Sequence, residues 1–168
     1  MSKIVNFKVL SGVAALLFVA ATCQPASALS AGSYVDFLNG GASAGASANG
    51  QWKFAKSKSS SKNGTNFGHG FGVGAGPNGI SLSNSIGVGG KGVGGIGHNL
   101  NMTIGRNGTH ISHGGVTSQG NGRIYTGGNT GIRNTGTQRG QIYGGSTSSG
   151  FGSRTRAWSN SRTRYWNR

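Results

Sequence analysis

The middle of the chain alternates larger and smaller residues over an unusual length. Between Phe67 and Gly76, glycine occupies every even position and larger residues occupy the odd ones. These larger residues are Phe67, His69, Phe71, Val73 and Ala75. Alternate residues of a β-strand point to opposite faces, so this two-residue period predicts a strand with one bare face.

The alternation continues in two further segments. Pro77-Asn78-Gly79 is typical of a turn, and after it the larger residues take the even positions. The larger residues of these segments are Ile80, Leu82, Asn84, Ile86 and Val88, and then Ile96, His98, Leu100, Met102 and Ile104. We therefore expect residues 67–113 to form a β-alternating, glycine-rich ribbon with one moderately apolar face and one nearly bare face.

A hairpin signal follows the third segment. Asn107-Gly108 is a pair that two-residue hairpin turns prefer. A turn centred on these two residues would pair Arg106 with Thr109, and Ile104 with Ile111.

The first 28 residues predict a signal peptide. Lys3 and Lys8 give a basic start, an apolar run follows, and Ala26-Ser27-Ala28 fits the small-x-small pattern of a signal peptidase site. We place the cut after Ala28 and expect a secreted, extracellular protein. A lipoprotein anchored through Cys23 is the second reading. A retained membrane anchor is disfavoured, because the run is shorter than the ~20 residues of a spanning helix.

The composition after residue 28 argues against a conventional hydrophobic core. Leu, Ile, Val and Phe make up about 16% of residues 29–168, and Cys23, the sole cysteine, would be removed with the leader. Without Lys3 and Lys8, fourteen basic residues face the single acid Asp36, a net charge of +13 with neutral histidines. Low hydrophobicity with high net charge is typical of disorder. We expect a largely disordered or irregular, low-complexity chain, with short β-strands and hairpins in the central region and no globular fold.

The segments on either side of the ribbon differ in composition. Residues 29–66 are rich first in Ala, Gly and Ser and then in Lys and Ser. Within them, Gly41 to Ala48 has alanine at every even position, which favours strand or coil. Gln51 to Gly64 is typical of a solvated linker, and less often of a polyanion contact. Residues 114–152 are rich in Gly, Thr, Asn and Gln and hold two imperfect repeats.

Residues 153–168 form an Arg/Trp-rich duplicated tail. Ser-Arg-Thr-Arg occurs twice, eight residues apart, each time followed within two residues by tryptophan. The candidate polyanion-binding residues are Arg154, Arg156, Trp158, Arg162, Arg164, Trp166 and Arg168. Because eight is an even offset, an extended chain would present both copies on one face. A solubilising, disordered tail is the alternative.

The residue types that catalysis requires are scarce. Asp36 offers no second carboxylate for acid–base chemistry, so we expect no enzyme and no catalytic residues. His110 and His113 suggest a metal site by spacing, but in a strand they would point to opposite faces. No glycine motif here opens a nucleotide-binding helix. We therefore expect no metal and no cofactor, and the leader argues against intracellular nucleic acid as a partner.

The alanine octet, the glycine-alternating ribbon and the Gly/Tyr repeats together resemble the secreted glycine-rich structural proteins of silks, cuticles, cell walls and shell matrices. That resemblance implies a non-enzymatic structural or extracellular-matrix protein. We expect it to assemble through β-pairing with other copies and to bind polyanions through its basic segments. Acidic polysaccharide, acidic matrix protein and mineral surfaces are the partners considered. The alternative is a cationic glycine-rich antimicrobial protein that acts on anionic membranes.

Overall fold

The described residues form stacked antiparallel sheets. The computed structural model describes residues 28–168 except 39–40, 121, 134–139 and 167–168. The described part holds ten strands: β1 (Leu29–Leu38), β2 (Gly41–Asn49), β3 (Trp52–Lys62), β4 (Thr65–Gly76), β5 (Gly79–Gly90), β6 (Gly94–Gly105), β7 (Gly108–Ser118), β8 (Arg123–Arg133), β9 (Gln141–Phe151) and β10 (Arg156–Tyr165). The expectation of a largely disordered or irregular chain is therefore wrong.

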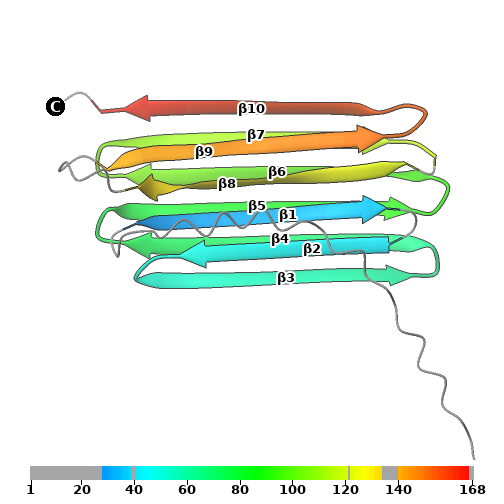
Figure 1. Cartoon of the computed structure of the whole chain (residues 1–168), viewed down its shortest axis with the longest axis horizontal. Coiled ribbons are helices and arrows are strands. Elements are labelled where there is room, and N and C mark those ends of the chain that lie inside the picture. Colours follow the sequence, from blue (N-terminus) through cyan, green and yellow to red (C-terminus); the bar gives the residue numbers. More distant parts are fainter. Residues whose placement is uncertain (1–27, 39–40, 121, 134–139, 167–168) are drawn as a thin grey trace, which may run out of the picture.

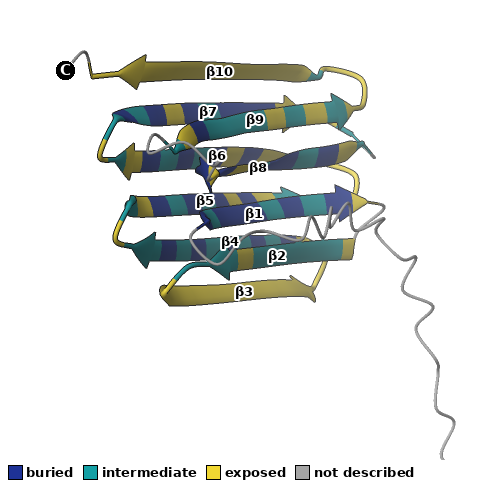
Figure 2. Cartoon of the chain, turned by 60° about the vertical axis from the view of Figure 1, so that its left-hand side comes forward, coloured by how far each residue is buried: buried dark blue, intermediate teal, exposed yellow. Residues whose placement is uncertain are grey.

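The strands make a small and a large sheet that lie face to face. The four-stranded sheet has the order β2-β1-β8-β9, and the six-stranded sheet has the order β10-β7-β6-β5-β4-β3. Figure 1 shows the strands of both sheets running along a common axis. The outermost strands of the large sheet, β10 and β3, extend beyond the small sheet and are exposed along their whole length, as Figure 2 shows.

The bare face of the central ribbon is the face that packs inside. In β4 the glycines at alternate positions from Gly68 to Gly74 are buried, whereas the phenylalanines and Val73 are only partly covered. In β5, Ser81, Ser83 and Ser85 are fully buried, while Ile80 and Ile86 are more than 40% exposed. The larger apolar residues of β4, β5 and β6 therefore face outward, as does Ile111 of β7, whereas Val116 of β7 is buried. Gly, Ser, Asn and Thr residues form most of the layer between the sheets.

Glycine allows the two backbones to approach each other closely. A Cβ on Gly70, Gly72 or Gly74 of β4 would overlap a carbonyl oxygen of β2. For Gly72 that oxygen belongs to Ser47, and the carbonyl oxygen of Gly32, which pairs with Ser47 in the small sheet, would lie 3.1 Å away. Only a residue without a side chain fits between these groups.

Hydrogen bonds between side chains hold the centre of this layer together. Ser33 Oγ of the small sheet lies 2.7 Å from Ser83 Oγ and 2.8 Å from Ser85 Oγ of the large sheet. Farther along, Thr103 Oγ1 and Thr130 Oγ1 are 2.6 Å apart. Buried hydroxyls and amides are costly only when they lack partners, so this network permits a polar interior.

Apolar side chains close the interior at the two ends of β1. Leu29 packs with Ile132 and Ile142 at one end. Phe37 packs with Val116 and Ile124 at the other. Leu29, the first residue of β1, is also the residue that would follow the expected cleavage site. The expected leader lies outside the described residues, except for Ala28.

The structure corrects two local interpretations. Lys/Ser-rich residues 52–62 are edge strand β3 rather than a linker. The hairpin between β6 and β7 turns at Arg106 and Asn107, so Ile104 pairs with Thr109. The expected pairing of Ile104 with Ile111 is wrong by two residues. An alternating pattern cannot detect such a slip, because moving a strand by two residues keeps every side chain on its own face.

Candidate functional site

Strand β10 carries one cationic edge of the large sheet. We call the side of the large sheet that points away from the small sheet the outer face. By register, Arg156, Arg162 and Arg164 lie on it beside Thr117, Ile111 and Thr109 of β7. Trp158 lies on the same face, and a Cβ on Gly115 would be 3.0 Å from its indole ring. The indole ring of Trp158 therefore lies against Gly115, where a larger residue would have to displace it.

The other residues of the expected tail site lie off this strand. Arg154 is in the turn before β10, and Trp166 follows its end. The backbone N–H of Trp166 donates to the carbonyl oxygen of Asn107 at 2.8 Å. Arg168 lies outside the described residues. The structure thus brings Arg156, Trp158, Arg162 and Arg164 onto one face, but not as two complete copies.

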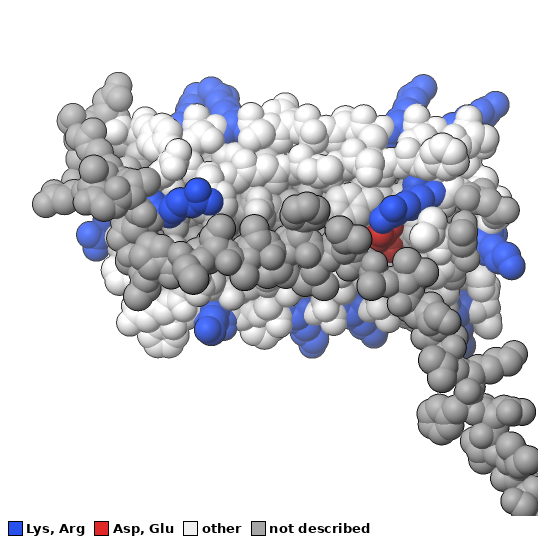
Figure 3. Space-filling view, in the orientation of Figure 1, with Lys and Arg blue, Asp and Glu red and all other residues white. Residues whose placement is uncertain are grey.

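Strand β3 carries a second cationic edge on the opposite side. Lys56 and Lys58 pair with Phe71 and His69 of β4, which places them on the outer face, and Lys62 lies at the strand end. Lys53 lies on the other face of the same strand. Figure 3 shows Lys and Arg side chains along both long edges of the molecule, over β10 and over β3. Sequence reasoning favoured the tail, and it missed that the lysine tract is its counterpart.

The central part of the outer face is largely apolar and separates the two edges. Its residues come from alternate positions of six strands, and their register aligns them in rows across the sheet. One such row is Arg162, Ile111, Met102, Leu82, Val73 and Phe54. Its exposed members include Trp52 at 72%, Ile96 at 58% and Ile111 at 43%.

Two histidines meet Trp158 on the outer face. The His98 and His113 ring centroids are 6.3 Å apart, and Trp158 lies 5.9 Å from the first and 5.1 Å from the second. Burial, and then the charge of His113, lower the pKa of His98. The described residues contain no group of three or more His, Cys, Asp and Glu side chains that would hold a metal ion.

His110 and His113 lie on opposite faces of β7. His113 belongs to the outer face, whereas His110 is 1% exposed between the sheets. Its Nδ1 lies 2.8 Å from Thr163 Oγ1 of β10, and its Nε2 has no hydrogen-bond partner among the described residues. Burial lowers the pKa of His110, so the neutral imidazole is the favoured form.

The single acid of the chain is already ion-paired. On the outer side of the small sheet, Arg123 Nε donates to Asp36 Oδ1 at 2.9 Å, and a second nitrogen of the same guanidinium donates to Oδ2. The hydrogen bond to Asp36 raises the pKa of Arg123. Tyr34 and Tyr125 stack beside this pair with centroids 6.3 Å apart. Asp36 therefore neutralises Arg123 and leaves the cations of both edges uncompensated.

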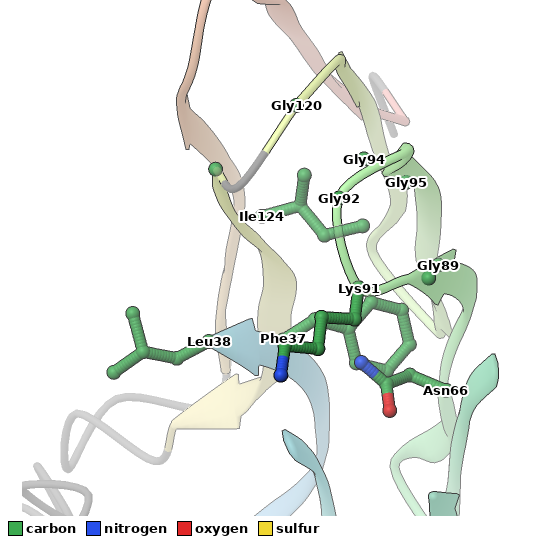
Figure 4. Close-up of a pocket in the computed structure, with 12 residues that line it drawn as sticks. Phe37, Leu38, Asn66, Gly89, Lys91, Gly92, Gly94, Gly95, Gly120 and Ile124 are labelled. Carbon is green, nitrogen blue, oxygen red and sulfur yellow. The ribbon is translucent and has the colours of Figure 1, made fainter. Parts of the chain in front are cut away.

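A small cavity lies at one end of the interior. Figure 4 shows Phe37, Asn66 and Lys91 around it, with Ile124 and the glycines of the β5–β6 turn. Its volume is about 20 Å³. A water molecule needs a cavity of ~10–15 Å³, so this cavity holds about one water and no organic substrate.

Comparison of the chain with protein-family models, with curated proteins and with solved structures gave no match. The described residues contain no helical segment of the length and hydropathy that crossing a bilayer requires.

Proposed function

We propose that this chain is a secreted, non-enzymatic structural protein that cross-links polyanions through the two cationic edges of its large sheet. The carrying observation is the placement of arginines along β10 and lysines along β3, with no free acid to neutralise them. Arginine pairs bidentately with sulfate, phosphate and carboxylate, and lysine adds point charges.

The separation of the edges supports bridging. Six strands span five inter-strand spacings, so the edges are roughly 24 Å apart. This distance is about three times the Debye length at physiological salt, ~8 Å. The two edges therefore act as independent sites, and one molecule can hold two polyanionic chains.

Assembly through β-pairing is the second part of the proposal. Adjacent strands are antiparallel and the large sheet has an even number of them, so β10 and β3 run in opposite directions. A copy shifted sideways would bring its β10 beside β3 in antiparallel orientation. Edge lysines and arginines oppose such pairing. A polyanion that neutralises both edges would remove this repulsion.

A sulfated polysaccharide tests the proposal. One variant replaces Arg156, Arg162 and Arg164 with Gln, a second replaces Lys53, Lys56, Lys58 and Lys62 with Gln, and a third combines both sets. Each single-edge variant should elute from a sulfated column at lower salt than the unaltered protein, and the combined variant should elute at the lowest salt of all. In solution, only the unaltered protein should scatter light on mixing with the polysaccharide. Unchanged retention of the combined variant would show that the edges are not the binding sites.

A further inference from the structure

The apolar area of the outer face is large enough to be a binding surface. On the four central strands, five rows of outward-facing side chains cover roughly 14 Å by 27 Å, about 390 Å². The largest apolar patch of a typical soluble monomer is ~300–600 Å² and is often a contact site. Here the exposed aliphatic residues are spread over the central strands: Ile80, Ile86, Val88, Ile96, Ile104 and Ile111.

Cations surround this apolar area. Lys56 and Lys58 lie on the β3 side, and the arginines of β10 lie on the opposite side. Lys91 is in the β5–β6 turn and Arg106 is in the β6–β7 turn, which are at opposite ends of β6. The face itself carries no acid, because Asp36 belongs to the small sheet. Its charge complements an anionic partner on every side.

Tryptophan occupies the border between the apolar area and the cations. Trp52 on β3 is 72% exposed and Trp158 on β10 is 49% exposed. Trp158 lies on the same strand face as Arg156 and Arg162. Aromatic rings at a boundary between apolar and charged groups are typical of surfaces that lie in the headgroup region of a bilayer.

These observations select one occupant. A second copy on the same face would set cationic borders against cationic borders. A polysaccharide would satisfy the cations but would leave the isoleucines in water. An acidic protein would be expected to meet a compact cluster of anchor residues, whereas here the aliphatic side chains are distributed evenly.

We propose that the outer face docks flat on the surface of a bilayer that contains anionic lipids. The isoleucines and valines enter the boundary between headgroups and acyl chains, and the surrounding lysines and arginines contact lipid phosphates. The inference rests on the proposed function only in that the same edge cations supply the electrostatic attraction. The apolar contribution is separate, so the two proposals can fail separately.

The test compares the unaltered protein with two variants. The face variant carries Ile86→Thr, Ile96→Thr and Ile111→Thr, which keep β-branched side chains and all cations. The edge variant carries Arg156→Gln, Arg162→Gln and Arg164→Gln. Binding is measured by co-sedimentation and tryptophan fluorescence with vesicles of phosphatidylcholine alone or mixed with phosphatidylglycerol. Each protein is also run on the sulfated column, and circular dichroism confirms that each variant is folded.

The unaltered protein should bind only the mixed vesicles, with a blue-shifted tryptophan emission. The face variant should elute normally from the sulfated column but bind vesicles at least roughly 50-fold more weakly. Each Ile→Thr removes two carbon groups and adds a hydroxyl, and one buried methylene alone is worth roughly fourfold in partitioning. The edge variant should bind both the sulfated column and the mixed vesicles more weakly than the unaltered protein does. If the face variant were unfolded, Val88→Thr alone should still weaken vesicle binding severalfold.

Other outcomes would overturn the lipid proposal. Equal vesicle binding by the face variant would do so and leave polyanion binding intact. So would retention on the sulfated column without vesicle binding. Dimers that the face substitutions dissociate, without vesicle binding, would make a second copy the occupant. Retention on a polyglutamate column that the face substitutions abolish, without vesicle binding, would indicate an acidic protein. Failure on both column and vesicles would overturn both proposals.

Discussion

His110 and Gly144 face each other across the space between the two sheets, and the imidazole occupies the place that a Cβ on residue 144 would need. Such a Cβ would overlap Nε2 and Cδ2 of the ring and lie 2.8 Å from Thr130 Oγ1. The ring has little freedom to move away, because it is buried and bonded to Thr163. Gly144 is therefore a requirement of the fold rather than a flexible point in β9.

Gly144→Ala should lower the free energy of unfolding by about 1–3 kcal/mol, the usual cost of overpacking. Gly145→Ala is the matched control, because a Cβ there would meet nothing within 4 Å. Alanine is also favoured over glycine in a strand, so the control should be neutral or slightly stabilising. Urea unfolding of both variants measures the difference. Equal stability of the two would contradict the packing described here.

The same histidine should make the protein sensitive to acid. The pKa of His110 is lowered from 6.5 by burial, so the folded state binds its proton less readily than the unfolded state does. The free energy of unfolding should be constant with respect to this group above pH 6.5, and should fall as the pH falls from about 6.5 towards the lowered pKa. The lowered pKa of His98 acts in the same direction.

Urea unfolding at several pH values between neutral and mildly acidic conditions measures this slope. His110→Gln should flatten it, because the group that titrates differently in the two states is gone. His69→Gln is the control, because His69 lies on the outer face, where its Nε2 is within hydrogen-bond distance, 2.8 Å, of Asn84 Oδ1. A slope that His110→Gln leaves unchanged would assign the acid sensitivity to other groups.

Alternation in the sequence located the central strands but not their packing. The pattern that begins at Phe67 belongs to β4, and the two later segments belong to β5 and β6. Alternation shows that a segment has two different faces, but it does not show which face is buried. Apolar residues usually face inward, whereas here Ser83 and Asn101 do. The low content of apolar residues therefore predicted disorder wrongly. In this fold, hydrogen bonds and glycine packing replace much of the usual apolar core.

The candidate surface was likewise predictable only in part. Even spacing placed Arg156, Trp158 and Arg162 on one face, and the structure has them there. The same even spacing puts Lys56 on one face of its strand together with Phe54. The lysine edge could therefore have been predicted by the same argument. The meeting of His98 with His113 could not, because it depends on the register between β6 and β7. Turn geometry sets that register, and the predicted turn was one residue out, which shifts the pairing by two residues.

The glycine row of β4 offers a second packing test. In Gly72→Ala the new methyl group would overlap the carbonyl oxygen of Ser47, and backbone atoms cannot rotate away as a side chain can. We expect a loss of about 3 kcal/mol or more, at or above the upper end of overpacking costs. Gly76→Ala in the same strand is the control, because its nearest neighbour would be Leu29 Cδ2 at an ordinary 3.9 Å. It should change stability by less than about 0.5 kcal/mol. Thermal unfolding of the two variants would decide, and a tolerated Gly72→Ala would mean that the sheets are farther apart.

The polar interior reverses the usual effect of hydrophobic substitution. Asn101 is fully buried, accepts a hydrogen bond from Ser83 Oγ and donates to Asn99 Oδ1 and to the carbonyl oxygen of Gly145. Leucine has a similar volume but can make none of these bonds. Asn101→Leu would leave several buried polar groups without partners, each costing about 1–3 kcal/mol.

We therefore expect Asn101→Leu to destabilise the protein by several kcal/mol although it makes the interior more apolar. Ile96→Thr on the same strand makes the surface more polar, and it should cost less than about 1 kcal/mol because Ile96 is 58% exposed. Urea unfolding ranks the two variants, and circular dichroism checks that both retain the sheets. If the interior were held by apolar contact alone, the ranking would be the opposite: the leucine variant would be the more stable, and the threonine variant would lose the larger share of its stability.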